Sequence, residues 1–375
     1  MERKIFMKIF YDYKIFYKQY WGGPSRYFLS LAKNINELKN EVHVYSPIYV
    51  NKYLEIFKKK YPNSVKGSYL KKKIKYSSKL INLYNRFKSS SDLNNNKFDI
   101  YHSTYYGDAL HNSKKIPLII TVHDLIHEIF TGKKNMKDLD IKEKILNQAD
   151  HIICVSKNTQ NDLIKFYNVD EKKTSVIYHG AANIFVDDLI KEQEVNKIFN
   201  PYFLYVGSRH GYKNCGNFLK AYMDSESLKK NFKIVFFGGG NFTYNEKNYF
   251  KDLKINNNNI FHVEGDDNVL KNLYLNAEAL VYPSLYEGFG MTPIEAMYYG
   301  CPVISSETSS LKEIQGDASL KFKPENINEI KECLDKITSS SDLKKKLINS
   351  GYNQVKKYSW EKCASETIKV YNLFS

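Results

Sequence analysis

The sequence predicts an α/β protein built from two doubly wound domains, each with a parallel sheet. Strand-like apolar runs alternate with helix-like segments along both halves of the chain, which is the pattern of parallel sheets with crossover helices. A charged, poorly patterned stretch near residues 187–200 separates the two halves. With 375 residues and 42% apolar content, the chain is long enough for two domains that each bury a core.

Six strands and three helices are predicted in the first half, which we assign to a domain of residues 1–187. The strands are short apolar runs, at Ile5–Phe10, Val42–Ser46, Phe98–Tyr101, Pro117–Val122, Ile152–Val155 and Ser175–Tyr178. The helices have apolar residues at helical spacing, at Ser25–Leu38, Asp140–Gln148 and Asn158–Tyr167.

The second half repeats this alternation after a predicted linker at residues 188–200. We assign residues 201–356 to a second domain, with strands at Tyr202–Val206, Lys233–Phe237, Ile260–Val263, Ala279–Tyr282 and Val303–Ser305. Glycine or serine residues lie at the carboxyl ends of several of these strands, at Gly207, Gly238–Gly240, Gly265 and Ser284. Because ligands of such sheets bind outside the carboxyl ends of the strands, this rim is the predicted ligand site.

Two glutamates, Glu287 and Glu295, lie eight positions apart around a glycine turn at this rim. Gly288 and Gly290 permit tight or positive-φ backbone, and Thr292 to Glu295 reads as an N-cap, a first-turn proline and a glutamate at the third helical position. A helix is therefore predicted from Thr292, and the free N–H groups at its start suit a phosphate. In a plainer interpretation, Glu295 only closes a capping box and Glu287 is a solvated loop residue.

The segment from Ser284 to Pro302 resembles the Glu-x7-Glu signature of the family 4 glycosyltransferases. The resemblance covers essentially the whole chain, and it is strong from about Tyr202 to Pro324 and thinner before Val155. The resemblance implies the GT-B fold, in which two Rossmann-like domains face each other across a cleft, and transfer with retention of configuration. It implies that Glu287 contacts the donor sugar and that Glu295 binds the nucleotide ribose. The amides of Gly288, Phe289, Gly290 and Met291 are then expected to meet the donor phosphate or sugar. It also implies that a helix in residues 357–375 crosses back to the first domain.

The loop that follows strand 202–206 carries two cations, Arg209 and Lys213. Arginine can bind a diphosphate through two hydrogen bonds and lysine acts as a point charge. The resemblance implies that both cations neutralise the departing donor pyrophosphate, with Gly207 in the donor site. The alternative is that this loop is merely a solvated surface.

Five further candidates come from the first half. Gly22 and Gly23 lie in a turn before a helix and are similar to the family's amino-terminal Gly-Gly loop, which implies that they approach the donor phosphate. His123 and Asp124 follow a buried strand, and the resemblance implies that His123 contacts the transferred sugar and that Asp124 lies on the acceptor side. His102, at another strand end, is a further acceptor-side candidate. Each histidine could instead be structural.

No metal or cofactor is predicted. His123 and His127 have the spacing of helical zinc ligands, but residue 124 is aspartate where that motif needs glutamate. Asp138 and Asp140 precede a charged helix and do not follow a buried strand, so they are interpreted as a solvated helix entrance. The five cysteines are odd in number and widely spaced, which fits a reducing compartment better than a disulfide framework.

The positive charge is concentrated in one segment. Residues 52–88 hold eleven lysines and Arg86 against the single acid Glu55, in a chain of formal charge +15. Aromatic residues are interleaved with these lysines, so the segment could bind anionic lipid headgroups or nucleic acid, or form only a solvated face. Nucleic acid is the weakest of the three. No apolar run approaches the length of a membrane span, so we expect a cytoplasmic protein with a possible peripheral contact at the membrane.

The sequence therefore predicts a metal-independent, retaining glycosyltransferase that moves a hexose from a nucleotide-diphosphate donor to a glycan or lipid-linked acceptor. General resemblance to bacterial surface-polysaccharide transferases favours a GDP-mannose-like donor, and UDP- or dTDP-sugars are alternatives. A nucleotide-sugar 2-epimerase would share the fold. A basic membrane- or nucleic-acid-binding protein is the alternative that is not an enzyme.

Overall fold

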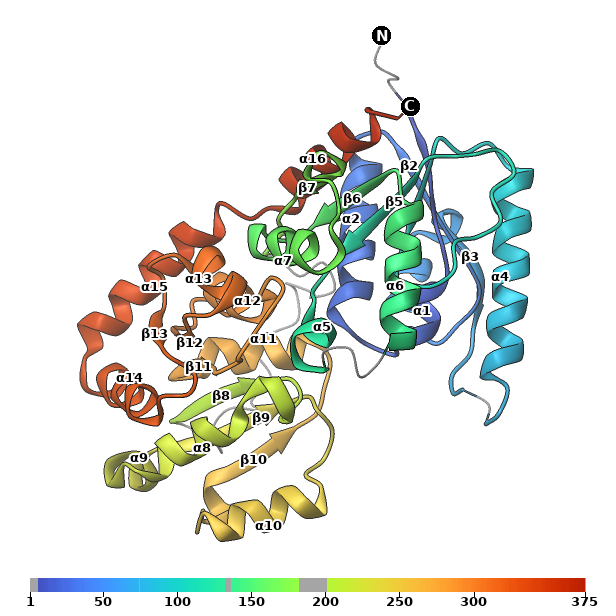
Figure 1. Cartoon of the computed structure of the whole chain (residues 1–375). Coiled ribbons are helices and arrows are strands. Elements are labelled where there is room, and N and C mark those ends of the chain that lie inside the picture. The colour runs from blue at the N-terminus through green and yellow to red at the C-terminus, as the bar shows by residue number, and fades with distance from the viewer. Residues whose placement is uncertain (1–5, 74, 132–135, 182–200, 375) are drawn as a thin grey trace. The chain divides into compact units, whose positions relative to one another are not determined.

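Every strand pairing in the described part of the chain is parallel, and the strands form two sheets. The computed structural model describes residues 6–73, 75–131, 136–181 and 201–374 (Figure 1). The chain divides into two units, with unit 1 formed by residues 1–180 and 359–375 and unit 2 by residues 181–358. The predicted linker at 188–200 lies outside the described residues.

Unit 1 contains a seven-stranded sheet in the order β3-β2-β1-β4-β5-β6-β7. Its strands are β1 (Lys8–Tyr11), β2 (Glu41–Tyr49), β3 (Val65–Tyr69), β4 (Ile100–Ser103), β5 (Leu118–Val122), β6 (His151–Cys154) and β7 (Thr174–Val176). The central strands β4, β5 and β6 are buried along their whole length, as expected of parallel strands covered on both faces.

The helices of unit 1 are α1 (Lys14–Lys18), α2 (Gly23–Glu37), α3 (Lys52–Lys60), α4 (Ser78–Asn95), α5 (Ile126–Thr131), α6 (Met136–Gln148), α7 (Lys157–Tyr167) and α16 (Trp360–Tyr371). The last helix of the chain, α16, lies beside α2 (Figure 1). Its Tyr371 hydroxyl lies 2.7 Å from Nδ1 of His102 on β4, so the chain's end is tied to the sheet of unit 1.

Unit 2 contains a six-stranded sheet in the order β10-β9-β8-β11-β12-β13. The strands are β8 (Tyr202–Val206), β9 (Lys233–Phe237), β10 (Ile260–Val263), β11 (Ala279–Tyr282), β12 (Val303–Ser306) and β13 (Leu320–Phe322). The helices are α8 (Cys215–Met223), α9 (Glu226–Asn231), α10 (Tyr244–Asp252), α11 (Asp267–Asn276), α12 (Met291–Tyr298), α13 (Ser309–Gln315), α14 (Ile327–Ser339) and α15 (Ser341–Val355).

Each sheet has a point where the strand order reverses. In unit 1 the chain moves outward from β1 to β3 and then returns to place β4 on the other side of β1. In unit 2 it moves from β8 to β10 and then returns to place β11 beside β8. Such a switch point leaves a crevice at the carboxyl ends of the two strands, where doubly wound sheets bind ligands.

Candidate functional site

A lysine and a glutamate meet at the switch point of unit 2. Lys213 lies in a short 3-10 turn after β8, and Glu287 lies in the loop after β11. Lys213 Nζ is 2.6 Å from Glu287 Oε1, and it also donates to the Tyr282 hydroxyl at 3.0 Å. The side chain of Lys213 is 15% exposed and that of Glu287 is 10% exposed. This pair joins the two loops that the sequence predicted to share a rim.

Backbone contacts fix the two loops against each other. The Leu285 N–H donates to the Tyr212 carbonyl oxygen at 2.7 Å. The Asn214 side-chain amide donates to the carbonyl oxygens of Pro283 at 3.1 Å and Pro324 at 2.7 Å. Asn214 adopts a left-handed backbone (φ 52°), which asparagine tolerates better than most residues. Lys213 is therefore presented by a turn that is anchored on the Glu287 loop.

The backbone of Glu287 is held by the first residues of α13. Its N–H donates to Ser309 Oγ at 2.9 Å, and Ser310 Oγ donates to its carbonyl oxygen at 2.8 Å. Burial is the main cause that raises the pKa of Tyr282, and the neighbouring Glu287 carboxylate adds to it, so Tyr282 stays protonated. The Glu287 carboxylate thus contacts one ammonium and one neutral phenol, and its backbone is fixed independently.

The predicted helix start at Thr292 is wrong, because α12 begins at Met291 with Gly290 as its N-cap. Gly290 has φ +94°, a conformation that only glycine adopts easily, and no side chain caps the helix. Thr292 therefore lies inside the first turn, and the Thr292–Glu295 capping box does not form. Glu295 does not occupy the third helical position that a capping-box glutamate takes, because the N-cap is Gly290, and the Glu295 side chain is buried. Its contact with a ribose stays a prediction.

Gly288 and Phe289 connect Glu287 to this helix start. The Phe289 side chain is buried and packs edge-on against Tyr358, with ring centroids 5.8 Å apart. Phe289 thus anchors the glycine turn through its side chain, and only its backbone amide is a candidate for ligand contact.

Arg209 is buried and engaged with other parts of unit 2. Its Nε lies 2.5 Å from Glu246 Oε1, and its guanidinium donates to the carbonyl oxygens of Gly238 at 3.0 Å and Gly240 at 2.8 Å. Gly238, Gly239 and Gly240 all have positive φ, so these carbonyls can converge on one cation. Arg209 thus stabilises the loop of Gly238–Gly240 after β9 through these hydrogen bonds. Its predicted contact with a diphosphate stays a prediction.

The ion pair also sets the charge of Glu246. Burial alone would raise the pKa of this carboxyl, but hydrogen bonds from Arg209 and Thr243 outweigh burial and lower the pKa to about 2. A pocket of about 290 Å³ lies beside the pair and is lined in part by Gly211, Cys215 and Tyr249. Gly207, the residue after β8, has φ +116° and no heavy atom within 4 Å of an added Cβ, so a ligand can approach its backbone closely.

In unit 1, His123 follows β5 and is partly buried among aromatic rings. Its ring centroid lies 5.1 Å from that of Tyr27 and 5.9 Å from that of His179. Burial, with a smaller contribution from Lys142, lowers the pKa of His123 to about 3. His123 is therefore neutral at physiological pH and can take part in hydrogen bonds but carries no charge.

Asp124 has a structural task in unit 1. Its Oδ1 accepts from the Ile126 N–H at 3.1 Å at the start of α5, and its carbonyl oxygen accepts from Lys142 Nζ at 2.9 Å. An acceptor contact by Asp124 stays a prediction.

The prediction for His102 as an acceptor-side residue is contradicted by its surroundings. His102 is fully buried, and its two ring nitrogens lie 2.7 Å from the Tyr371 hydroxyl and 2.9 Å from Thr121 Oγ1. Burial lowers its pKa to about 3. Both polar atoms are thus satisfied inside unit 1, and His102 fastens α16 to the sheet.

Gly22 and Gly23 lie at the start of α2, as the sequence predicted. Gly22 is the N-cap and has an extended backbone (φ 166°), and Gly23 is the first helical residue, ahead of Pro24. The helix α1, which the sequence did not predict, separates them from β1. Their approach to a donor phosphate stays a prediction.

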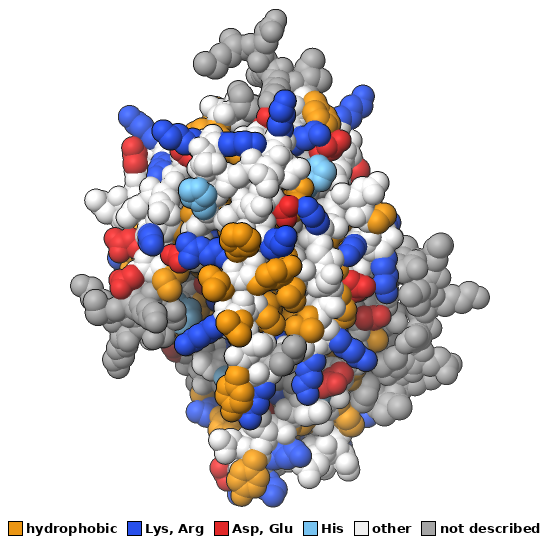
Figure 2. Space-filling model, turned by 90° about the vertical axis from the view of Figure 1, so that its right-hand side faces the viewer, with side chains coloured by type: hydrophobic (Ala, Val, Ile, Leu, Met, Phe, Trp, Pro, Cys, Tyr) orange, Lys and Arg blue, Asp and Glu red, His pale blue; other side chains and the backbone are white. Residues whose placement is uncertain are grey.

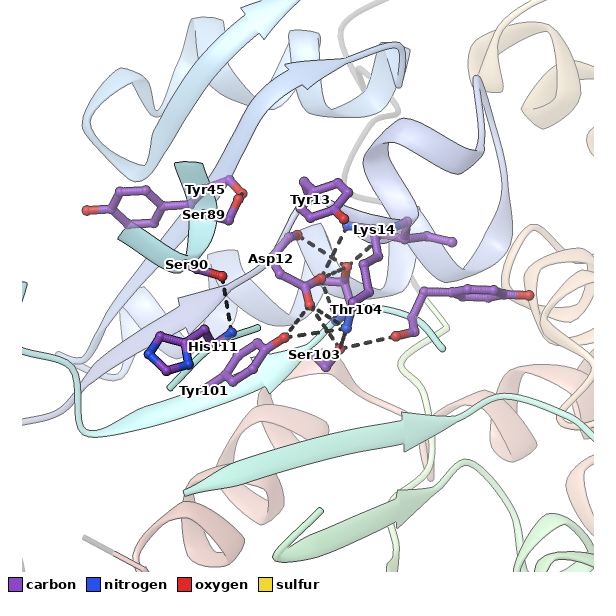
Figure 3. Close-up of polar contacts among 12 residues, drawn as sticks. Asp12, Tyr13, Lys14, Tyr45, Ser89, Ser90, Tyr101, Ser103, Thr104 and His111 are labelled. Carbon is purple, nitrogen blue, oxygen red and sulfur yellow. Dashed lines mark hydrogen bonds and ion pairs between the residues drawn. The ribbon is translucent and has the colours of Figure 1, made fainter. Parts of the chain in front are cut away.

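Sequence reasoning missed the residue at the centre of the switch point of unit 1. Asp12, directly after β1, is fully buried and forms an ion pair of 3.1 Å with Lys14 (Figure 3). It accepts hydrogen bonds from the hydroxyls of Tyr101 at 2.7 Å, Ser103 at 2.9 Å and Thr104 at 2.6 Å. The available signal was position, since an acid directly after a buried strand at a sheet rim is costly unless it is paired.

The sequence of each unit matches a family model. The model described as Glycosyltransferase Family 4 matches residues 21–182, and the model described as Glycosyl transferases group 1 matches residues 187–354. An uncharacterized glycosyltransferase of Methanocaldococcus jannaschii is 28% identical over 371 residues, which cover 96% of this chain and 97% of the relative. The O-antigen chain mannosyltransferase RfbU of Salmonella typhimurium is 33% identical over 222 residues, which cover 56% of this chain and 59% of the relative.

A solved structure shows the same fold. A glycosyltransferase from Rickettsia africae has a TM-score of 0.71 at 18% sequence identity, with 98% of each chain covered. This likeness confirms the predicted GT-B fold class of two parallel-sheet α/β domains. The two family models together cover most of the sequence, so the chain is a glycosyltransferase of the kind that joins a family 4 domain to a group 1 domain.

Proposed function

We propose that this glycosyltransferase moves a hexose from a nucleotide-diphosphate sugar with retention of anomeric configuration. The observation that carries the proposal is the 2.6 Å pair of Lys213 and Glu287 at the switch point of unit 2. A cation and a carboxylate side by side suit a ligand that has a phosphate next to hydroxyl groups. The N-terminus of α12 lies after the same loop and offers backbone N–H groups that no side chain caps.

In this mechanism the bond between the anomeric carbon and the donor phosphate oxygen breaks. Lys213 stabilises the negative charge that develops on the departing diphosphate, which is the electrostatic task that positioned cations perform in phosphoryl and glycosyl transfer. The Glu287 carboxylate accepts hydrogen bonds from hydroxyls of the sugar, and Glu295 holds the ribose. Retention follows when the acceptor hydroxyl attacks the face from which the diphosphate leaves, forming the new glycosidic bond while its proton passes to an oxygen of the departing diphosphate. For unit 1 the proposal keeps the neutral His123 as a hydrogen-bonding group for the sugar.

The donor is proposed to be GDP-mannose or a similar hexose nucleotide. The similarity to an O-antigen chain mannosyltransferase supports a mannose donor. UDP- and dTDP-sugars are the alternatives, and a thermal-shift panel of GDP, UDP and dTDP separates them. A nucleotide that binds only the native protein raises its stability by about 2.7 kcal/mol at a concentration of 100 Kd. We expect GDP to give the largest shift, and a larger shift with UDP or dTDP would reassign the donor.

The central experiment substitutes the pair itself. Lys213→Ala and Glu287→Ala are each expected to lower the rate of sugar transfer by about 10²–10³-fold, the usual cost of removing one preorganised charge from a reacting site. Lys172→Ala, an exposed lysine of unit 1, is the control and should transfer at the wild-type rate. Undiminished turnover in either site variant would overturn the assignment. Product analysis without an acceptor separates a 2-epimerase, which would release free sugar or epimer, from a transferase.

The acceptor is proposed to be a glycan or a lipid-linked sugar, reached from the cytoplasmic side of a membrane. Among the described residues no helix is long and apolar enough to cross a bilayer. Within the basic segment of residues 52–88, we propose that α4 makes the lipid contact. Three of its apolar side chains are exposed to solvent, Leu80 by 71%, Leu83 by 64% and Phe87 by 70%. These residues and Tyr84 recur at helical spacing on one face, and Figure 2 shows apolar side chains gathered among lysines and arginines.

In the first part of α4 a polar side chain faces the sheet and apolar side chains face solvent. The Asn85 side chain bonds the N–H and carbonyl oxygen of Ile48 at 2.8 Å each, while Leu80 and Leu83 are exposed. Only Leu93, near the end of the helix, is a buried leucine of α4. Cationic residues with outward apolar side chains suit an anionic lipid surface. Leu83→Ser with Phe87→Ser should reduce sedimentation with anionic liposomes several-fold, and Leu275→Ser, an exposed leucine of unit 2, should not. Liposome binding unchanged by the double substitution would exclude this face, and retention on RNA or DNA instead would favour nucleic acid.

A further inference from the structure

The switch point of unit 1 opens into a pocket of about 450 Å³, a volume typical of ligand sites. Residues after β1 and β4 line it on one side, and residues of α4 line it on another. Asp12 and its hydrogen-bonded partners lie beneath it and fix Lys14 and the start of the loop after β4 (Figure 3). Sheets of this kind bind ligands at this position, and nothing in the proposed donor chemistry uses it.

The lining of the pocket is strongly cationic. Among the described residues it carries Lys14, Lys18, Lys73, Lys79 and Arg86, against the one carboxylate Asp108. Lys14 is compensated by Asp12, and Arg86 pairs with Asp108 at 3.0 Å. No carboxylate in the described part of the chain pairs with Lys73 or Lys79, so these two lysines give the pocket an excess of positive charge, which favours an anionic ligand.

Aromatic rings hold two of these lysines in place. The Lys18 ammonium lies 4.2 Å from the ring centroid of Tyr105, and that of Lys73 lies 5.0 Å from the ring centroid of Tyr17. Lys73 Nζ also donates to the carbonyl oxygen of Lys18 at 3.3 Å. Such contacts keep the ammonium groups near the pocket and reduce the entropy that a bound anion would cost. Tyrosine hydroxyls and rings in the same lining suit a sugar attached to that anion.

The helix α4 has one side on this pocket and also carries the exposed apolar side chains described above. Lys79, Asn82 and Arg86 line the pocket, while Leu80, Leu83 and Phe87 on the same helix are exposed to solvent. A ligand with a phosphate group next to a hydrocarbon chain fits both features, because its phosphate would lie among the lysines while its chain stays in the lipid on which α4 rests.

We propose that this pocket binds the phosphate or diphosphate group that joins the acceptor sugar to its lipid. The inference rests on the proposed function, and it selects a phosphorylated lipid-linked acceptor over a neutral glycan. The pocket supplies recognition and positioning only, and no bond is made or broken at the phosphate.

The test measures binding of the full-length protein to three probes, a short water-soluble polyprenyl diphosphate, the matching polyprenol and inorganic diphosphate. The expected order of affinity is polyprenyl diphosphate, then inorganic diphosphate, then polyprenol. Lys18→Glu with Lys79→Glu should weaken binding of polyprenyl diphosphate by at least about tenfold, since each reversal replaces attraction by repulsion. Lys172→Glu controls for the change in overall charge and should bind like the wild type.

The donor site must be separated from this pocket, because it too can take a diphosphate. Polyprenyl diphosphate binding that is lost in Lys213→Ala and kept in the Lys18 and Lys79 variant would overturn the proposal, and so would equal affinity for the polyprenol. Inorganic diphosphate binding as tightly as the prenylated probe would restrict the site to a free phosphate and overturn the lipid-linked assignment. Thermal shifts with nucleoside diphosphates test the donor site separately. If they fail while the pocket binds its probe, the proposed function fails and the pocket stands.

Discussion

Each unit has an acid and a lysine paired at the switch point of its sheet, and the two pairs differ in how many hydrogen bonds the acid accepts from the protein itself. In unit 1, Asp12 is fully buried, and its carboxylate accepts three hydroxyl hydrogen bonds in addition to the Lys14 ion pair. In unit 2, the Glu287 carboxylate contacts Lys213 and Tyr282 and keeps some exposure to solvent. A carboxylate has about four acceptor positions, so Asp12 is saturated by the protein while Glu287 can still accept from a ligand.

This difference gives the Asp12–Lys14 pair a structural role and is consistent with the ligand-binding role proposed for Lys213 and Glu287. Burial by itself would raise the pKa of Asp12, but Lys14 and the hydrogen bonds from Thr104 and Tyr101 lower it below its ordinary value. Asp12 thus stays ionised as a fixed part of the sheet rim. Unit 2 has a comparable structural pair in Arg209 and Glu246, separate from the Lys213–Glu287 pair to which the proposed function gives the chemistry.

The largest expected effect comes from removing the acid of each pair. Asp12→Ala should lower the free energy of unfolding by about 4–5 kcal/mol, because it leaves Lys14 as an uncompensated buried charge with three hydroxyls unpaired. Glu287→Ala should cost less than about 1.5 kcal/mol, because Lys213 is near enough to solvent to turn into water. Urea denaturation followed by circular dichroism measures both.

The effects on activity should rank in the opposite order, when activity is measured on the folded protein only. Glu287→Ala should lose transfer while remaining folded, and Asp12→Asn, which keeps the shape of the side chain, should retain donor binding in unit 2. A destabilisation by Glu287→Ala as large as that by Asp12→Ala would show that both pairs are structural, and the comparison would fail.

A smaller effect is expected from the saturated pair of unit 2. Glu246→Gln should cost about 2–3 kcal/mol, since a charge-assisted hydrogen bond to Arg209 becomes a neutral one and the guanidinium loses its counter-charge. The pKa of Glu246 is lowered from its ordinary value of 4.5 to about 2. Its contribution to stability is therefore fully present above about pH 4.5 and is lost as the pH falls toward 2.

The measurement is the stability of wild type and Glu246→Gln between pH 7 and pH 2.5. The gap between the two proteins should narrow steadily below pH 4.5. A constant gap over this range would mean that Arg209 and Glu246 do not form a charged pair. Arg209 and Glu246 could then no longer be counted as the structural ion pair of unit 2.

Much of the fold could be predicted from the sequence because the central strands carry a strong local signal. The buried runs at β5 and β6 and all strands from β8 to β12 were found within a few residues of their observed ends. The strands β3 and β13 were missed, since β3 is short, lies at a sheet edge and contains Gly67. The helix α4 was not predicted, because two of its buried side chains, Asn85 and Ser89, are polar. Leu80 and Leu83 are exposed and only Leu93 is buried, so the apolar residues do not mark the buried face.

Site residues could be predicted where a reactive side chain follows a strand of the sheet. They could not be predicted where the role of a side chain depends on a partner that is distant in the sequence. Lys213 and Glu287 lie in the loops that follow β8 and β11, so their meeting at one rim follows from parallel topology. His102 also stands on a strand, but the Tyr371 hydroxyl, 269 residues away in the sequence, satisfies one of its nitrogens. The pairing of Arg209 with Glu246 and that of Asp12 with Tyr101 depend on contacts of the same long-range kind.

The smallest of the three effects compares two glycines that begin helices in the two units. Gly290 has φ +94°, and a Cβ there would lie 2.6 Å from Leu311 Cδ2, so Gly290→Ala combines backbone strain with a clash and should cost about 1–3 kcal/mol. Gly22 has extended backbone that any residue adopts, and its Cβ would meet only the flexible end of Gln19. Gly22→Ala should therefore cost less than about 1 kcal/mol.

Measurements of nucleotide binding and activity then distinguish the roles of Gly290 and Gly22. Gly290→Ala should weaken nucleotide binding together with stability, because the strain distorts the α12 N-terminus that follows Glu287. If Gly22→Ala is stable but has lost activity, its glycine is needed for the close approach of a phosphate, as the sequence predicts. If Gly22→Ala is stable and fully active, the amino-terminal glycine turn serves only to start α2, and the donor phosphate is held by unit 2 alone.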